Sequence, residues 1–159
     1  MDFHVGDKVI HCTHGLGEIV QIEQKTICGN LTDCYVVQIG EMMIWIPIDD
    51  LQQHSLRLPA RPEEFIGLSA ILTGPSEQLQ EDRQLRKDQL LAQMHDGQLA
   101  SLCRVVRDLT YFKRVNKKLN DQESSILDRA TNSLITEWSH SLDISPNQAL
   151  QAMTNLLGK

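Results

Sequence analysis

Residues 8–25 read KVIHCTHGLGEIVQIEQK, and apolar and polar side chains alternate in this stretch around two glycines. A period of two places successive side chains on opposite faces, which is typical of half-buried antiparallel strands. The pattern continues to about residue 58 and predicts five short strands, at 8–13, 17–25, 33–39, 42–46 and 56–58. We expect these strands to close into a small β-barrel, because closure removes exposed edges.

A segment rich in proline and glycine, residues 59–75, follows the strands. Its apolar piece at 65–72 is compatible with one short helix, and we interpret the segment as a boundary between domains. Beyond residue 76 glycine becomes rare and the apolar period becomes that of a helix. The carboxy-terminal half therefore belongs to a different structural class from the first.

Four amphipathic helices are predicted in this second half. The first spans about 77–94 and the second begins after Gly97; the third begins at a capping box of Asn120 and Glu123, and the fourth has Ser145 as its N-cap. Each helix must bury its apolar stripe against another, which favours a bundle. The predicted fold class is α+β with two domains: a small Tudor-like β-barrel over 1–60, a linker over 61–75, and a compact all-α helical domain over 76–159.

Charge is distributed unevenly along the chain. The 159 residues carry a net charge of −6, and residues 1–75 hold four Lys or Arg against ten Asp or Glu. Residues 83–118 instead hold nine basic side chains against three acidic ones. An acidic half and a basic block are expected to meet different partners.

The sequence offers neither a membrane span nor a secretory signal. Its longest apolar run, at 42–48, is far shorter than the roughly 20 residues of a transmembrane helix. The amino terminus lacks the basic and apolar stretches of a signal peptide. We therefore expect a cytoplasmic protein with no membrane partner, whose four cysteines remain thiols.

Signals for enzymatic chemistry are weak. There is no phosphate loop, dinucleotide fingerprint or nucleophile elbow. A metal site could use His11, Cys12 and His14 together with Cys28 and Cys34. However, His11 and Cys12 point to opposite faces of a strand, and no cysteine knuckle is present. We expect no metal and no cofactor, and interpret these residues as small buried thiols and turn histidines; a small metal-dependent enzyme is a remote alternative.

Two predicted helices carry basic faces. A cationic helix face can displace counterions from a phosphate backbone, and a tyrosine on it can stack or wedge. The alternative is an ordinary solvated face, with Asp88 and Asp108 as counter-charges. The candidate DNA-contacting residues are Arg83, Arg86, Lys87, Arg104, Arg107, Tyr111, Arg114 and Lys118.

A second candidate surface lies on the predicted sheet. If Met42, Ile44 and Ile46 face inward, alternation places Met43 and Trp45 outside. An exposed tryptophan on a small sheet is a good contact anchor. Alternatively, the segment 59–75 covers Trp45.

Several motifs of this chain resemble those of the CarD/CdnL family of transcription regulators. FHVGDKV at 3–9, THGLGEI at 13–19 and the strand that ends with Ile46 and Pro47 resemble the family's amino-terminal module, which is shared with the transcription-repair coupling factor. VVRDL at 105–109, followed by Leu119, Glu123 and Ala130, resembles its helical domain. The order and spacing of these motifs extend over nearly the whole chain.

This resemblance implies a Tudor-like barrel that docks on the β subunit of bacterial RNA polymerase. It also implies a helical domain that reaches promoter DNA at the upstream edge of the melted bubble. Of the family's polymerase-contacting positions, Lys25 keeps the positive charge, whereas Trp45 stands where an arginine is often found. That difference changes the kind of contact from ion pairing to apolar packing.

In the helical domain, Arg86 and Arg107 match basic positions of the family. Many members place a wedging tryptophan where this chain has Arg83, or next to it, so the resemblance implies phosphate contact but not the wedge. We expect a monomeric, non-enzymatic regulator that binds polymerase through Lys25, Trp45 and Met43. Promoter DNA is then bound weakly, at the high effective concentration that tethering provides. The alternative is a protein-interaction module that does not contact DNA.

Overall fold

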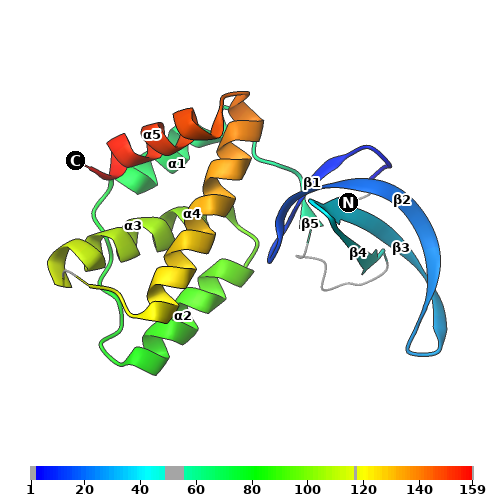
Figure 1. Ribbon diagram of the computed structural model, residues 1–159, viewed down its shortest axis with the longest axis horizontal. Coiled ribbons are helices and arrows are strands. Elements are labelled where there is room, and N and C mark those ends of the chain that lie inside the picture. The colour runs from blue at the N-terminus through cyan, green and yellow to red at the C-terminus, as the bar shows by residue number, and fades with distance from the viewer. Residues whose placement is uncertain (1–2, 49–55, 117, 159) are drawn as a thin grey trace. The chain divides into compact units, whose positions relative to one another are not determined.

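The computed structural model describes residues 3–48, 56–116 and 118–158 (Figure 1). The chain divides into two compact units, Met1–Pro59 and Ala60–Lys159. The described part of the first unit is built from strands and that of the second from helices, which confirms the predicted α+β class. The strands are β1 Lys8–His11, β2 Gly15–Ile27, β3 Asn30–Ile39, β4 Met42–Pro47 and β5 Leu56–Arg57.

The strands form one antiparallel sheet in the order β4-β3-β2-β1-β5. Cys28 and Gly29 join β2 to β3 with φ angles of 51° and 81°. The favoured two-residue hairpin turn requires positive φ at both central residues. Because Cys28 and Gly29 form such a tight turn, β2 and β3 pair up to Ile27 and Asn30 and are longer than predicted. The sequence predicted that the strands close into a barrel. Within the described residues, β4 and β5 are the two ends of the sheet and do not pair with each other; β5 is a two-residue strand that pairs with β1.

One face of the sheet, here called the inner face, carries the core of the β unit. Phe3 packs edge-on against Tyr35 with ring centroids 5.6 Å apart, and the Phe3 amide donates to the Tyr35 hydroxyl. Gly17 is required at its position, because a Cβ there would lie 2.5 Å from the Ile39 side chain. The buried apolar residues of this core are Phe3, Val9, Ile19, Tyr35, Val37 and Leu56.

The helices of the second unit are α1 Glu64–Thr73, α2 Arg83–His95, α3 Leu99–Asn116, α4 Asp121–Leu142 and α5 Pro146–Leu157. The N-caps Asn120 and Ser145 each form the capping box predicted from the sequence. None of the described helices is long and apolar enough to cross a membrane.

Helix α1 lies inside the segment that was predicted to be a linker. Its residues Phe65, Leu68 and Leu72 are buried in the core of the helical unit, and the Phe65 ring packs 5.2 Å from that of Trp138. The amide of Ala60 donates to the buried Glu137 carboxylate on α4. Residues 61–75 are therefore part of the helical unit, and they close its core against α3 and α5.

Helix α2 begins six residues later than predicted. Asp82 is its N-cap and accepts hydrogen bonds from the amides of Gln84 and Leu85. The residues before it, 74–82, form an irregular connector between α1 and α2. Because the amide of Glu77 donates to Asp108 on α3, the connector follows α3 instead of extending α2.

Candidate functional site

The outer face of the sheet carries a compact polar and aromatic cluster. Trp45 on β4 donates its indole N–H to Glu23 Oε1 on β2 at 2.5 Å. The Lys25 ammonium lies 3.9 Å from the centroid of the same ring. We call Glu23, Lys25, Met43 and Trp45 the outer-face cluster. Met43 is 41% exposed and shares this face with Trp45 through the alternation along β4.

Two buried side chains belong to the same face. Val36 pairs directly with Trp45 in the strand register, and Cys34 pairs with Glu23. Both are almost completely buried, and burial raises the pKa of the Cys34 thiol, although the nearby Lys25 charge acts in the opposite direction. Glu23 and Lys25 both contact the Trp45 indole and hold it in one orientation.

The position of Glu23 was not anticipated from the sequence. Glu23 and Lys25 share one face of β2 because they are two residues apart, but a bulge between Ile19 and Gln21 shifts the register with β3. That shift determines which residue of β2 meets the indole. In the sequence, the position of Glu23 is indicated only by the opposite charges of Glu23 and Lys25, which are two residues apart.

Arg86 is not on the basic surface where the sequence placed it. It is 7% exposed, and its guanidinium forms an ion pair with the buried Glu123 carboxylate of α4. Its Nη1 also donates to the carbonyl oxygens of Gln80 and Glu81, at 3.0 and 3.2 Å. The prediction was wrong because residues 77–82 lie over the first turn of α2 instead of continuing the helix.

Arg107 is also an interior residue, with a side chain only 10% exposed. Its Nε donates to Asp108 Oδ1 at 2.8 Å, and Nη1 lies 3.5 Å from the carbonyl oxygen of Ile71 on α1. The spacing along α3 predicted a solvent face, but α1 covers this side of the helix. Arg86–Glu123 and Arg107–Asp108 are called the interior pairs below.

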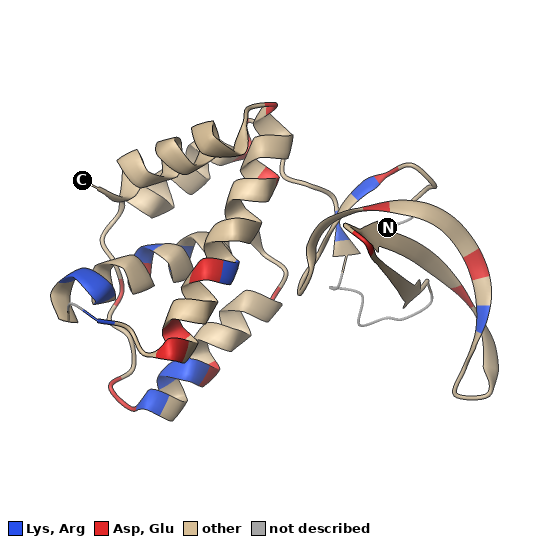
Figure 2. Ribbon diagram, viewed as in Figure 1, with Lys and Arg blue, Asp and Glu red and all other residues tan. Residues whose placement is uncertain are grey.

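The remaining candidates are at least partly exposed, and Figure 2 shows that Lys and Arg positions of the helical unit gather on α2 and α3. Arg83, Arg114, Lys118 and Tyr111 are exposed, while Lys87 and Arg104 are half-buried. None of these cations forms an ion pair with any residue that the structure describes. We call Arg83, Lys87, Arg104, Arg114 and Lys118 the surface cations. Lys113, which the prediction omitted, is also exposed at the end of α3.

The histidine and cysteine residues near the first hairpin form a turn. His11 Nδ1 accepts hydrogen bonds from the amides of Thr13 and His14, at 3.1 and 3.2 Å, and the two imidazoles stack 5.0 Å apart. Burial, followed by the charge of His14, lowers the pKa of His11. Within the described ranges, no three His, Cys, Asp or Glu side chains are grouped so that they could hold a metal ion.

These features define an α+β protein of two units, with an aromatic and charged cluster on its β unit and exposed cations on its helical unit. Residues 3–58 match the family model of the CarD-like/TRCF RID domain, and residues 67–154 match that of the CarD C-terminal domain. The chain belongs to the CarD-like transcription factor family, which is not a known enzyme family. It is 30% identical over 141 residues to a Bacillus subtilis (strain 168) protein named "Putative transcription factor YdeB". That similarity covers 85% of this chain and 89% of the relative.

Proposed function

We propose that this chain is a cytoplasmic, non-enzymatic transcription regulator that docks on the β subunit of bacterial RNA polymerase through the outer-face cluster. The observation that carries the proposal is the Trp45 ring, held by Glu23 and covered by the Lys25 ammonium. Trp45 and Met43 offer apolar contact area, and Lys25 supplies the charge. An aromatic anchor with fixed orientation binds at a low cost in conformational entropy.

The helical unit would then contact promoter DNA through the surface cations. The net charge of −6 makes independent binding to duplex DNA weak, but docking on polymerase raises the local concentration of DNA. A shift of about 1.4 kcal/mol changes the equilibrium of an open promoter complex tenfold. A few phosphate contacts by Arg83, Lys87 and Arg104 are enough to supply it.

Arg83 occupies the first turn of α2 and is exposed. An arginine can enter a narrow minor groove but does not unstack bases as an indole wedge does. The proposed action is therefore phosphate and groove contact at the upstream edge of the bubble, by a monomer that carries no wedge at this position.

A second function is favoured by the interior pairs. Because Arg86 and Arg107 are used inside the fold, the cationic surface is smaller than the sequence suggested. A module that binds polymerase or another protein and does not contact DNA agrees with this smaller surface. The two functions share the docking step and differ in the effect on DNA.

The docking step is tested by measuring capture of purified bacterial RNA polymerase on the immobilised full chain. We expect Lys25→Ala combined with Trp45→Ala to weaken capture by about tenfold or more, because the anchor and its cation are both lost. Met43→Ala and Met42→Ala form a matched pair, since both side chains are 41% exposed but lie on opposite faces of β4. Met43→Ala should weaken capture and Met42→Ala should not. Equal effects would show that docking uses another surface.

The DNA step is tested with the lifetime of open promoter complexes. Substituting Arg83, Lys87, Arg104 and Arg114 by alanine should abolish any effect of the protein on that lifetime while leaving capture of polymerase unchanged. Arg129→Ala, which removes an exposed cation of α4, is the control. If the fourfold variant alters the lifetime as the parent protein does, the interaction module without DNA contact is the correct function.

A further inference from the structure

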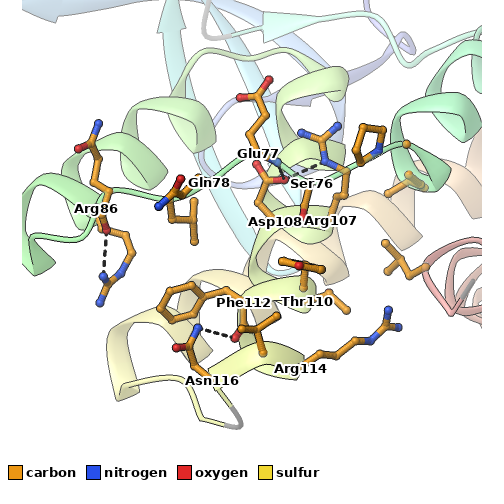
Figure 3. A pocket seen from close by; sticks show the side chains of 18 of the residues that line it. Ser76, Glu77, Gln78, Arg86, Arg107, Asp108, Thr110, Phe112, Arg114 and Asn116 are labelled. Carbon is orange, nitrogen blue, oxygen red and sulfur yellow. Dashed lines mark hydrogen bonds and ion pairs between the residues drawn. The ribbon is translucent and has the colours of Figure 1, made fainter.

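A groove of about 750 Å³ lies within the helical unit, between the connector 74–82 and the carboxy-terminal half of α3 (Figure 3). Leu157 of α5 also contributes to its lining. The size is in the range of sites that hold small organic ligands. Neither the polymerase contact nor the duplex contact proposed above requires such a concave site.

The connector wall of the groove is held in place by the interior pairs. Asp108 accepts a hydrogen bond from the amide of Glu77 at 3.0 Å, as Figure 3 shows, and Arg86 donates to the carbonyls of Gln80 and Glu81. Both anchors are buried and are themselves paired. The groove is therefore formed before any ligand arrives, which lowers the entropic cost of binding.

Three residues of α3 line the groove on one side of that helix. Arg107, Tyr111 and Arg114 follow each other at i, i+4 and i+7, a spacing that stacks side chains along one face. Tyr111 is 55% exposed, so one face of its ring is available for stacking. Arg114 is exposed and has no ion-pair partner among the described residues.

Arg107 adds an unused donor. Its Nη2 is buried and has no hydrogen-bond partner in the part of the chain that the structure describes, although Nε of the same guanidinium donates to Asp108. A buried donor without an acceptor is unfavourable, and an oxygen of a ligand at this end of the groove would supply one. The cations at the two ends of the row lie about 10 Å apart along the helix, with the tyrosine between them.

The remaining lining favours a ligand with many hydrogen-bonding groups and only one phosphate group. Ser76, Gln78 and Asn116 provide neutral donors and acceptors, as the edge of a nucleobase requires. Glu77 and Glu81 are exposed on the opposite wall and would repel a strongly charged anion. The same carboxylates can accept hydrogen bonds from sugar hydroxyl or exocyclic amino groups.

We propose that this groove binds one unstacked nucleotide, with the base on the Tyr111 ring and the phosphate at Arg114. The nucleotide comes either as a free monophosphate or as an unpaired residue of single-stranded DNA, since both offer one base and one phosphate group. At neutral pH the phosphate of the free monophosphate carries close to two negative charges and that of the strand carries one. Stacking on an aromatic side chain combined with one cation is the usual arrangement for binding single nucleotides without sequence readout.

The experiment is an NMR titration of the isotope-labelled full chain without polymerase. The probes are AMP, a hexathymidylate single strand, adenosine and inorganic phosphate. We expect shift changes at Tyr111 and Arg114 with AMP, with the single strand, or with both, and the stronger probe identifies the source. Tyr111→Leu and Arg114→Gln should each weaken binding about tenfold, whereas Tyr111→Phe keeps the stacking ring and should bind as the parent does.

Arg129→Gln is the control, because Arg129 is exposed on α4, does not line the groove and is not one of the surface cations. The proposal is overturned if neither nucleotide probe shifts the groove resonances, if inorganic phosphate binds as well as AMP, or if Tyr111→Leu has no effect. Stronger binding of ATP than of AMP would also contradict it, because the acidic wall should disfavour additional phosphates. Since polymerase is absent, failure here leaves the proposed docking and duplex contact untouched.

Discussion

Two arginines one turn apart on α2 lie in opposite environments. Arg83 is exposed and forms no ion pair with the residues that the structure describes, whereas Arg86 is buried against Glu123 of α4. On α3 the half-buried Arg104 and the interior Arg107 repeat this contrast. The same residue type thus maintains the fold in the interior pairs and offers free charge among the surface cations. Helical spacing alone does not separate the two roles.

The surface cations and the interior pairs differ in their solvation. A surface cation is solvated whether or not it has a partner, so its contribution to folding is small. A buried guanidinium has lost water and depends on its carboxylate and on backbone carbonyls. The contrast can be measured by substituting one residue from each set.

The largest effect is expected for Arg86→Ala. This substitution leaves the Glu123 carboxylate buried without its cation and frees the carbonyls of Gln80 and Glu81, so the free energy of unfolding should fall by about 3–5 kcal/mol. Urea unfolding followed by circular dichroism measures this change. Arg83→Ala, one turn earlier, is the matched control and should change stability by less than about 0.5 kcal/mol.

A double variant separates loss of the pair from loss of one partner. Arg86→Met with Glu123→Leu removes both charges and keeps most of the volume, so it should be more stable than Arg86→Ala. It also removes one half of the α4 capping box, which costs part of the gain. Equal destabilisation by Arg86→Ala and Arg83→Ala would abolish the distinction between the two sets.

The second effect concerns Asp108. Its Oδ1 accepts from Arg107 Nε and from the amide of Glu77, so Asp108→Ala leaves two partly buried donors without this acceptor. We expect a loss of about 2–3 kcal/mol in the free energy of unfolding. Asp88→Ala on the exposed side of α2 is the control, with a loss below about 0.5 kcal/mol. A similar loss in both variants would mean that Asp108 does not anchor the connector.

The features predicted correctly from the sequence are those set by local rules. Asn120 and Glu123 form the predicted capping box because both belong to one turn, and Trp45 faces outward because alternation fixes the face of a strand. The ion pair of Glu123 with Arg86 joins two helices, and the bond of Glu23 to Trp45 depends on a bulge. Such contacts are decided by tertiary packing, which a single sequence does not reveal.

The role of α1 shows the same limit. The prolines and glycines of residues 59–75 indicated a boundary between domains, and the sequence predicted only one short helix within it. Its burial of Phe65 against Trp138 and its cover over Arg107 depend on how the helices assemble. The surface cations keep their predicted exposure where no neighbouring element covers them, and their contact with DNA stays a prediction.

The third prediction concerns the pH dependence of the free energy of unfolding, which the buried Cys103 thiol should affect. Burial, and then the nearby Glu137 carboxylate, raise the pKa of Cys103 from 9.0 to about 12. The unfolded chain therefore releases this proton at lower pH than the folded chain, and stability is present below pH 9 and lost as pH rises toward 12. By about pH 10 the loss should reach roughly 1.4 kcal/mol.

Unfolding measured at neutral pH and at about pH 10 tests this by comparing the parent with Cys103→Ala, which should lose less stability over that interval. An identical pH dependence in the parent and Cys103→Ala would show that the thiol does not contribute.

The smallest effect on stability, and the most informative about function, is expected at the surface. Arg83→Ala should leave the free energy of unfolding within about 0.5 kcal/mol of the parent, because Arg83 is exposed and has no ion-pair partner within the described ranges. The effect of the protein on open-complex lifetime can be measured at several salt concentrations and plotted as its logarithm against the logarithm of the salt concentration. If Arg83 contacts a phosphate in the polymerase–promoter complex, Arg83→Ala should reduce the magnitude of this slope by about 0.9. Arg129→Ala should leave that slope unchanged. If the slope is the same for Arg83→Ala and Arg129→Ala, Arg83 does not contact DNA.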